Sequence, residues 1–219
     1  RPGPLAVEPG TGAWGFAGDR ARKAGRLEKL ELRLPPLAIT GGGSTFSWEN
    51  PAAPSLGTTL DLSFDLSRLV EWSQYFRGMP WPFVLRGTGS MTVKAALVKG
   101  ALATLECEGM IPALVVKDLI QGQVSLPQRI KWDLGGKADL ARQVAVLENF
   151  SLAGSGFLLG LQEPASAAWG KHLEVLAKIT ADLELDKIMG GLGPLLGGAR
   201  PAELGGKVRL EEEVAWRPA

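Results

Sequence analysis

The stretch that decides the fold is "AKITADLEL", residues 177–185, in which apolar and polar side chains alternate without a break. Its odd-numbered positions are all apolar, whereas Lys178, Thr180, Asp182 and Glu184 are polar. Because successive side chains of a strand point to opposite faces of its sheet, this alternation predicts a strand with one apolar and one solvated face. Such strands are typical of antiparallel sheets.

The same alternation recurs along most of the chain. Further segments that show it are "LEKLELRL" (27–34), "TTLDLSFDL" (58–66), "SMTVKAAL" (90–97), "QRIKWDL" (128–134), "RQVAVLENFSL" (142–152), "GFLLGL" (156–161) and "GKVRLEEEVAW" (206–216). The 29 glycines and 15 prolines punctuate the chain every few positions, as expected for short strands joined by turns. The sequence therefore predicts a mainly β fold built on an antiparallel sheet.

Short helices interrupt the predicted strands at two or three places. Apolar residues at helical spacing predict a first helix from about Leu66 to Phe76, with Asp65 as its N-cap. A second helix is predicted from about Leu185 to Leu192, and a third is possible at "AWGKHLEVL", residues 168–176. These helices are too few to cover eight or more strands, so we expect them to cap the sheet.

The first two helices belong to a unit that occurs twice. Residues 65–70 align with residues 184–189, and the strand after Gly89 aligns with the strand after Gly206. The copies lie about 120 residues apart, which indicates a repeated architecture. We interpret the chain as one β domain, 1–219, that consists of a lead-in, a first unit and a shorter second unit at residues 1–13, 14–156 and 157–219.

Charge and hydropathy exclude two classes of protein. With 24 Lys and Arg against 23 Asp and Glu, the net charge of +1 argues against nucleic acid as a partner, since that requires a basic surface. A basic cluster exists, but acidic residues interrupt it, so we interpret it as a solvated face, with contact to anionic headgroups as the alternative; it consists of Arg20, Arg22, Lys23, Arg26, Lys29 and Arg33. No apolar stretch approaches the roughly 20 residues that span a bilayer.

The sequence offers no set of residues for catalysis or for holding a metal or cofactor. Cys107 and His172 are the only residues of their types, and no zinc-binding or nucleophile-elbow motif occurs. Glu106 and Glu108 share a strand face, where a solvated role is expected. We therefore predict a protein that is not an enzyme and that has no cofactor and no metal.

The apolar face of the predicted sheet must be covered by something. One possibility is a closed sandwich or barrel with an ordinary core. The other is a curved sheet, like a groove or half-barrel, whose apolar face stays open and marks a lipid, membrane or protein partner. Periodicity alone does not separate the two.

Several segments together resemble the AsmA family of bacterial envelope proteins. They are "LDLSFDLSRLVEWSQYF" (60–76), "VLRGTGSMTVKAAL" (84–97), "KADLARQVAVLENFSLAGSGFLLGLQ" (137–162), "ITADLELDKIMGGLGPLL" (179–196) and "LGGKVRLEEEVAW" (204–216). The resemblance covers residues 58–216 and, more loosely, 14–56, whereas "LPPLAITGGGSTFSWENPAAPSLG" (34–57) does not follow the family pattern.

The resemblance implies a long, curved antiparallel sheet with an apolar concave face. It also implies a location in the periplasm, with an inner-membrane anchor that lies outside this chain. The implied function is to carry phospholipid acyl chains between the inner and outer membranes and so to support outer-membrane homeostasis. The alternative is a non-enzymatic structural or assembly factor for the outer membrane or a secretion system, with an envelope protein as partner.

Apolar positions of the predicted strands are the candidates for lining a lipid groove. Each methylene of an acyl chain that they bury contributes about 0.8 kcal/mol. The candidates are Leu60, Leu62, Phe64, Met91, Val93, Ile130, Trp132, Ile179, Leu183, Val208 and Leu210.

Overall fold

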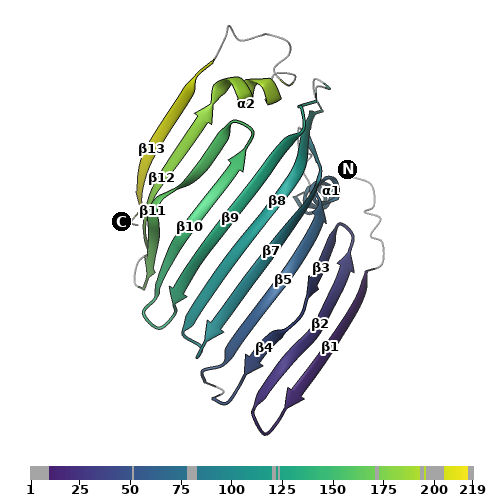
Figure 1. Ribbon diagram of the computed structural model, residues 1–219, viewed down its shortest axis with the longest axis vertical. Coiled ribbons are helices and arrows are strands. Elements are labelled where there is room, and N and C mark those ends of the chain that lie inside the picture. The colour runs from purple at the N-terminus through teal and green to yellow at the C-terminus, as the bar shows by residue number, and fades with distance from the viewer. Residues whose placement is uncertain are drawn as a thin grey trace.

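In a computed structural model, the chain forms one large curved antiparallel sheet with two short helices at one end (Figure 1). The structure describes residues 10–50, 52–77, 83–119, 122, 124–170, 173–192, 195 and 205–216, without the side chains of 72–77. Its elements are β1 (Thr11–Asp19), β2 (Ala24–Leu34), β3 (Leu37–Gly41), β4 (Ser44–Ser47), β5 (Ser55–Asp65), α1 (Leu66–Arg77), β6 (Phe83–Arg86), β7 (Thr88–Val98), β8 (Leu102–Asp118), β9 (Gln128–Asp139), β10 (Val144–Gly154), β11 (Phe157–Trp169), β12 (Leu173–Glu184), α2 (Leu185–Leu192) and β13 (Lys207–Trp216).

The strands follow one another through the sheet almost in chain order. The path is β1-β2-β3-β5-β7-β8-β9-β10-β11-β12-β13, and every neighbouring pair is antiparallel. β4 also pairs with β2 and β5, so β3 and β4 together fill the place of one interrupted strand. β6 pairs with the far end of β8. β1 and β13 are the two edges, and the predicted antiparallel sheet is confirmed.

Apart from β6 and β8, the elements form two copies of one unit, and the repeat is longer than the sequence indicated. The elements β1, β2, β3 with β4, β5, α1 and β7 correspond to β9, β10, β11, β12, α2 and β13. Equivalent backbone hydrogen bonds support this match. Trp48 N donates to Lys23 O at 2.8 Å and Trp169 N donates to Gln143 O at 2.8 Å. The second unit therefore begins at β9, whereas the interpretation of the sequence placed its start at residue 157.

The two copies also share an irregularity in the same strand. In β2, Lys29 pairs with Gly15 and Leu27 with Phe16, which leaves Glu28 as an extra residue. In β10, Leu147 pairs with Gly136 and Asn149 pairs with Gly135, which leaves Glu148 as the extra residue. Each is a β-bulge, which bends the strand and increases its twist.

The alignment of the helix-to-strand connections differs from the predicted one by two residues. Leu66 N donates to Gly87 O at 2.9 Å, and Leu185 N donates to Gly206 O at 3.0 Å. Gly87, with φ of 146°, is therefore the counterpart of Gly206, with φ of 120°, and the match of Gly89 with Gly206 was wrong. The sequence "RGTG" offers two glycines, and the required positive φ selects the first.

The first two helices form where they were predicted. At the start of α1, Asp65 Oδ1 accepts hydrogen bonds from Ser67 N at 2.9 Å and from Ser67 Oγ at 2.5 Å. Asp65 is therefore the N-cap of α1. The prediction of a possible third helix at residues 168–176 was wrong, because β11 continues to Trp169 and β12 begins at Leu173. Pairing with long neighbouring strands outweighs the weak helical spacing there, and His172 lies outside the described residues.

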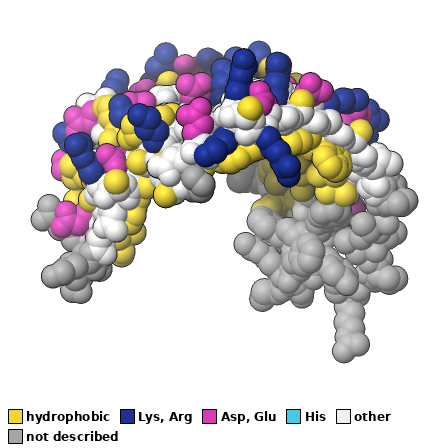
Figure 2. Space-filling model, turned by 90° about the horizontal axis from the view of Figure 1, so that it is seen from below, with side chains coloured by type: hydrophobic (Ala, Val, Ile, Leu, Met, Phe, Trp, Pro, Cys, Tyr) yellow, Lys and Arg dark blue, Asp and Glu magenta, His cyan; other side chains and the backbone are white. Residues whose placement is uncertain are grey.

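The sheet has almost no buried core among the described residues. Only four apolar side chains are buried among the described residues, Pro36, Val70, Ile111 and Ala165, and no large side chain is fully buried. Figure 2 shows the sheet from one end as an arch, with Lys, Arg, Asp and Glu on its outer side and hydrophobic side chains along its inner side. In the part of the chain that the structure describes, the sheet is neither a sandwich nor a closed barrel, since β1 and β13 do not pair with each other.

Candidate functional site

The inner side of the arch carries a row of cross-strand neighbours that crosses the whole sheet. In an antiparallel sheet, residues paired in register lie on the same face, so the pairing identifies the row. We call it the central row, and its members from β1 to β13 are Gly12, Leu32, Ile39, Leu62, Met91, Gly109, Trp132, Leu152, Leu159, Ala181 and Leu210. Every member is apolar or glycine, on eleven successive strands.

Two further rows flank the central row on the same face, which we call the concave face. The row nearer the helices includes Leu34, Leu37, Phe64, Ile111, Ile130, Phe157, Leu183 and Val208. The row nearer the β-turns includes Trp14, Leu30, Leu60, Val93, Cys107, Leu134, Phe150, Leu161, Ile179 and Glu212. Within the described strands, Glu212 is the one charged member of the three rows.

All eleven residues proposed from the sequence lie on this concave face. Leu62, Met91, Trp132 and Leu210 belong to the central row. Phe64, Ile130, Leu183 and Val208 belong to the row near the helices, and Leu60, Val93 and Ile179 to the row near the turns. Their exposure differs along the sheet: those on β13 are the most open, with Leu210 51% exposed.

The opposite face of the sheet is polar and held by ion pairs. Examples are Lys94 with Glu106 at 3.6 Å and Lys178 with Glu163 at 2.8 Å. Because these pairs are exposed, each contributes little to stability, but together they mark the face that water covers. The hydrogen bond and charge of Glu163 raise the pKa of Lys178. Such pairing holds the groups in their charged forms, unlike a general acid or base poised for proton transfer.

Glycines on the concave face lie directly beneath aromatic rings. A Cβ at Gly109 would lie 2.3 Å from the Trp132 ring, and one at Gly89 would lie 2.3 Å from the Phe64 ring. The two rings approach each other, with centroids 6.3 Å apart. The absence of a side chain therefore lets the rings lie across the neighbouring strand and form an aromatic floor at the centre of the arch.

A second aromatic group lies near the turn end of β1, β2 and β4. Phe16 stacks on Phe46 with centroids 5.2 Å apart, and Phe46 stacks on Trp48 at 5.3 Å. A Cβ at Gly25 would lie 2.3 Å from the Phe46 ring, so the ring-over-glycine arrangement recurs here.

Sequence reasoning did not select these glycines or the rest of the rows. The missed apolar members include Leu32, Ile39, Phe150, Leu152 and Leu159. Leu32, Phe150, Leu152 and Leu159 had a signal, because they occupy apolar positions of the alternating segments, whereas Ile39 lies outside those segments. The glycines also had a signal, since a glycine inside a strand marks a close approach.

The convex face carries a polar depression. This depression, of about 460 Å³, is lined mainly by polar side chains such as Thr92, Glu108, Lys131 and Asp133. Among the described residues, no three His, Cys, Asp or Glu side chains come together as metal ligands. The feature of the described residues that points to a ligand is the apolar concave face.

Comparisons with known proteins leave the chain without an identified relative. No family model, no curated protein and no solved structure matches it. Among the described residues, neither helix combines the length and apolar character needed to cross a bilayer. A function must therefore be inferred from the two faces of the sheet.

Proposed function

We propose that this chain is an AsmA-like module that carries phospholipid acyl chains along its concave face, between the inner and outer membranes of a bacterial envelope. It acts without catalysis, in the periplasm, and is held to the inner membrane by an anchor outside this chain. The observation that carries the proposal is the central row, which is apolar or glycine on eleven successive strands and is not buried in a core.

An uncovered apolar face of this extent has a thermodynamic preference for an apolar ligand. Burying apolar surface contributes roughly 25 cal/mol per Å², or about 0.8 kcal/mol for each methylene. Soluble proteins rarely leave such a large continuous patch in water unless it binds something. An acyl chain fits this face because it is flexible and has no polar group that requires a hydrogen-bond partner.

The distribution of charge supports binding of chains over recognition of a headgroup. The three rows contain one described charged residue, Glu212, which lies on the edge strand β13. Charged side chains instead lie on the outer side of the arch (Figure 2). A phospholipid would therefore place its tails against the floor and leave its headgroup in water at the rim.

The test compares a charge on the concave face with the same charge on the convex face. Leu62→Asp places a carboxylate in the central row, whereas Ser63→Asp places one on the opposite face, in the next residue of β5. Losing the roughly 1.5–3 kcal/mol of a leucine contact corresponds to about ten- to a hundredfold weaker binding. We expect Leu62→Asp to lose the phospholipid that mass spectrometry detects after mild purification, and Ser63→Asp to retain it.

A second matched pair tests the other half of the sheet. Ile179→Asp on the concave face should also lose lipid, and Thr180→Asp on the convex face should not. A photo-crosslinker at Leu62 should attach to acyl chains. The proposal fails if the wild-type protein carries no lipid, or if both members of each pair bind lipid equally. A protein partner retained by Leu62→Asp would then favour an assembly factor.

A further inference from the structure

The free edge of β13 is a pairing surface, and we propose that it binds the β13 strand of a second copy of this chain in antiparallel register. Every residue of β13 is exposed. β13 pairs with β12 without a bulge, and no other described strand pairs with it. Its row of backbone groups that face away from β12 is therefore uninterrupted and accessible. Addition of a further strand requires such an edge.

The internal repeat indicates that this position in the fold normally receives an antiparallel strand. The counterpart of β13 in the first unit is β7. One edge of β7 pairs with β5, and its other edge pairs with β8 from Ser90 to Val98. The pairing with β8 includes a charge match, because Lys94 lies opposite Glu106 and forms an ion pair with it. β13 presents the same edge without a described occupant.

The charges along β13 are complementary to themselves. On the convex face the strand carries Lys207 and Arg209, then Glu211 and Glu213. If two copies pair about a two-fold axis at Leu210, each Arg209 lies opposite Glu211 of the second copy. In the same register each Lys207 lies opposite Glu213 of the second copy. Opposite charges that face each other across a strand pair stabilise it.

Neighbouring registers lose this match. A shift of one residue would put the apolar face of one copy on the same side of the joined sheet as the polar face of the other. The cause is that side chains of a strand alternate between its two faces. A shift of two residues keeps two of the four opposite-charge pairs, Arg209 with Glu213 or Lys207 with Glu211. It also places two copies of Glu211 or two copies of Arg209 opposite each other at the axis. Repulsion between like charges disfavours both arrangements.

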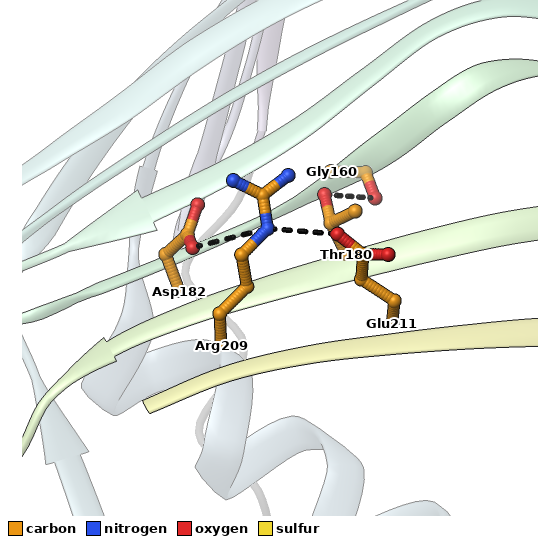
Figure 3. A network of polar contacts seen from close by, with 5 residues as sticks. All are labelled: Gly160, Thr180, Asp182, Arg209 and Glu211. Atoms are coloured by element: carbon orange, nitrogen blue, oxygen red, sulfur yellow. Dashed lines mark hydrogen bonds and ion pairs between the residues drawn. The ribbon is translucent and has the colours of Figure 1, made fainter. Parts of the chain in front are cut away.

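The side chain of Arg209 is already held on the correct face. Its Nε lies 2.9 Å from Glu211 Oε1 and 3.9 Å from Asp182 Oδ1 (Figure 3). Both contacts use Nε, and the two terminal nitrogens of the guanidinium point away from them (Figure 3). Those terminal nitrogens can donate to the carboxylate of Glu211 in the second copy.

The other free edge, β1, is a poorer partner for β13. Within β1 the one charged residue is Asp19, at its last position. β1 therefore offers nothing to match Lys207, Arg209 and Glu213 together. Pairing of β13 with itself also keeps both concave faces on the same side, with Leu210 at the join.

Charge reversal with rescue tests the proposal, and it does not depend on lipid. Sedimentation velocity over a concentration series of the wild-type chain should show a dimer that weakens as salt rises. The variant Lys207→Glu/Arg209→Glu and the variant Glu211→Lys/Glu213→Lys should each raise the dissociation constant about tenfold or more. An equimolar mixture of the two variants should restore dimers. Lys94→Glu, which changes an internal pair, should leave the dimer unchanged.

Disulfide trapping tests the register. In a Cys107→Ser background, Leu210→Cys should give a covalent dimer on oxidation, because paired residues at a two-fold axis lie within disulfide range. Ala215→Cys, which would lie opposite Gly205 of the second copy, should not. A wild-type chain that stays monomeric, a mixture that does not restore dimers, or equal trapping at both positions would overturn the proposal. Each of these outcomes leaves the lipid measurement on Leu62→Asp unaffected.

Discussion

Replacing Gly109 with alanine tests whether the Trp132 ring lies flat against the sheet. The added Cβ would lie 2.3 and 2.5 Å from two ring carbons of Trp132 and 2.7 Å from the backbone oxygen of Ser90. Ordinary carbon contacts are about 3.5–4.0 Å, so the ring must move and the β7–β8 pairing must adjust. Overpacking of this kind typically costs 1–3 kcal/mol.

Part of that cost is offset in the unfolded state. Alanine restricts the unfolded chain more than glycine does, which stabilises the fold by about 0.4–1 kcal/mol where the residue fits. The expected net loss for Gly109→Ala is therefore about 0–2.6 kcal/mol in the free energy of unfolding. Urea denaturation followed by far-ultraviolet circular dichroism measures it.

Gly57→Ala is the control, in β5, which β7 separates from β8. A Cβ at Gly57 would meet only Thr45 Oγ1, at 3.5 Å, which is an ordinary contact. We expect this variant to be as stable as the wild type or more so by up to about 1 kcal/mol. Equal stability of Gly109→Ala and Gly57→Ala would refute the reasoning, because the two sites would then have the same room above the sheet.

Two other predictions concern the ends of the repeated unit. A hydrogen bond from the Ser67 hydroxyl is the main cause that lowers the pKa of Asp65, so this carboxylate stabilises the fold above the pKa that it has in the unfolded chain. Asp65→Ala should lower the free energy of unfolding by about 0.5–2 kcal/mol at pH 7, and the difference should shrink as pH falls through the lowered pKa, which urea titrations at several pH values measure. Both Gly87 and Gly206 have positive φ, but a Cβ at Gly87 would also lie 2.7 Å from Ala113 O, whereas one at Gly206 meets nothing within 4 Å. Gly87→Ala should therefore lower the midpoint of thermal unfolding more than Gly206→Ala, and an equal effect would show that backbone strain alone decides.

The strands and their faces were predictable because a two-residue period is a local property. The stretch 177–185 was predicted to place Ile179 and Leu183 on one face, and both lie on the concave face. The openness of that face was not predictable. An apolar face shows the same alternation under a second sheet, inside a barrel or in contact with a ligand. What covers a face is a non-local property.

The errors have similar causes. The possible helix at residues 168–176 rested on a few apolar residues, and its segment instead completes two long strands. The interrupted strand formed by β3 and β4 follows from the glycines at 41–43, which gave no sign that both pieces would pair with the same neighbours. The aromatic floor depends on which glycine a ring meets on the next strand, and only the register decides that.

The paired bulges have a consequence for how the chain tolerates deletions. Removing one residue from a strand normally turns every following side chain over to the wrong face. At Glu28 and Glu148 the opposite holds. Leu27 and Leu30 both lie on the concave face, as do Leu147 and Phe150, so the apolar pattern changes phase at each glutamate. Deleting either glutamate would restore an unbroken alternation and keep all side chains on their faces. Such a deletion would remove the local bend, and at Glu148 also the ion pair with Lys137, while the apolar face keeps its chemistry.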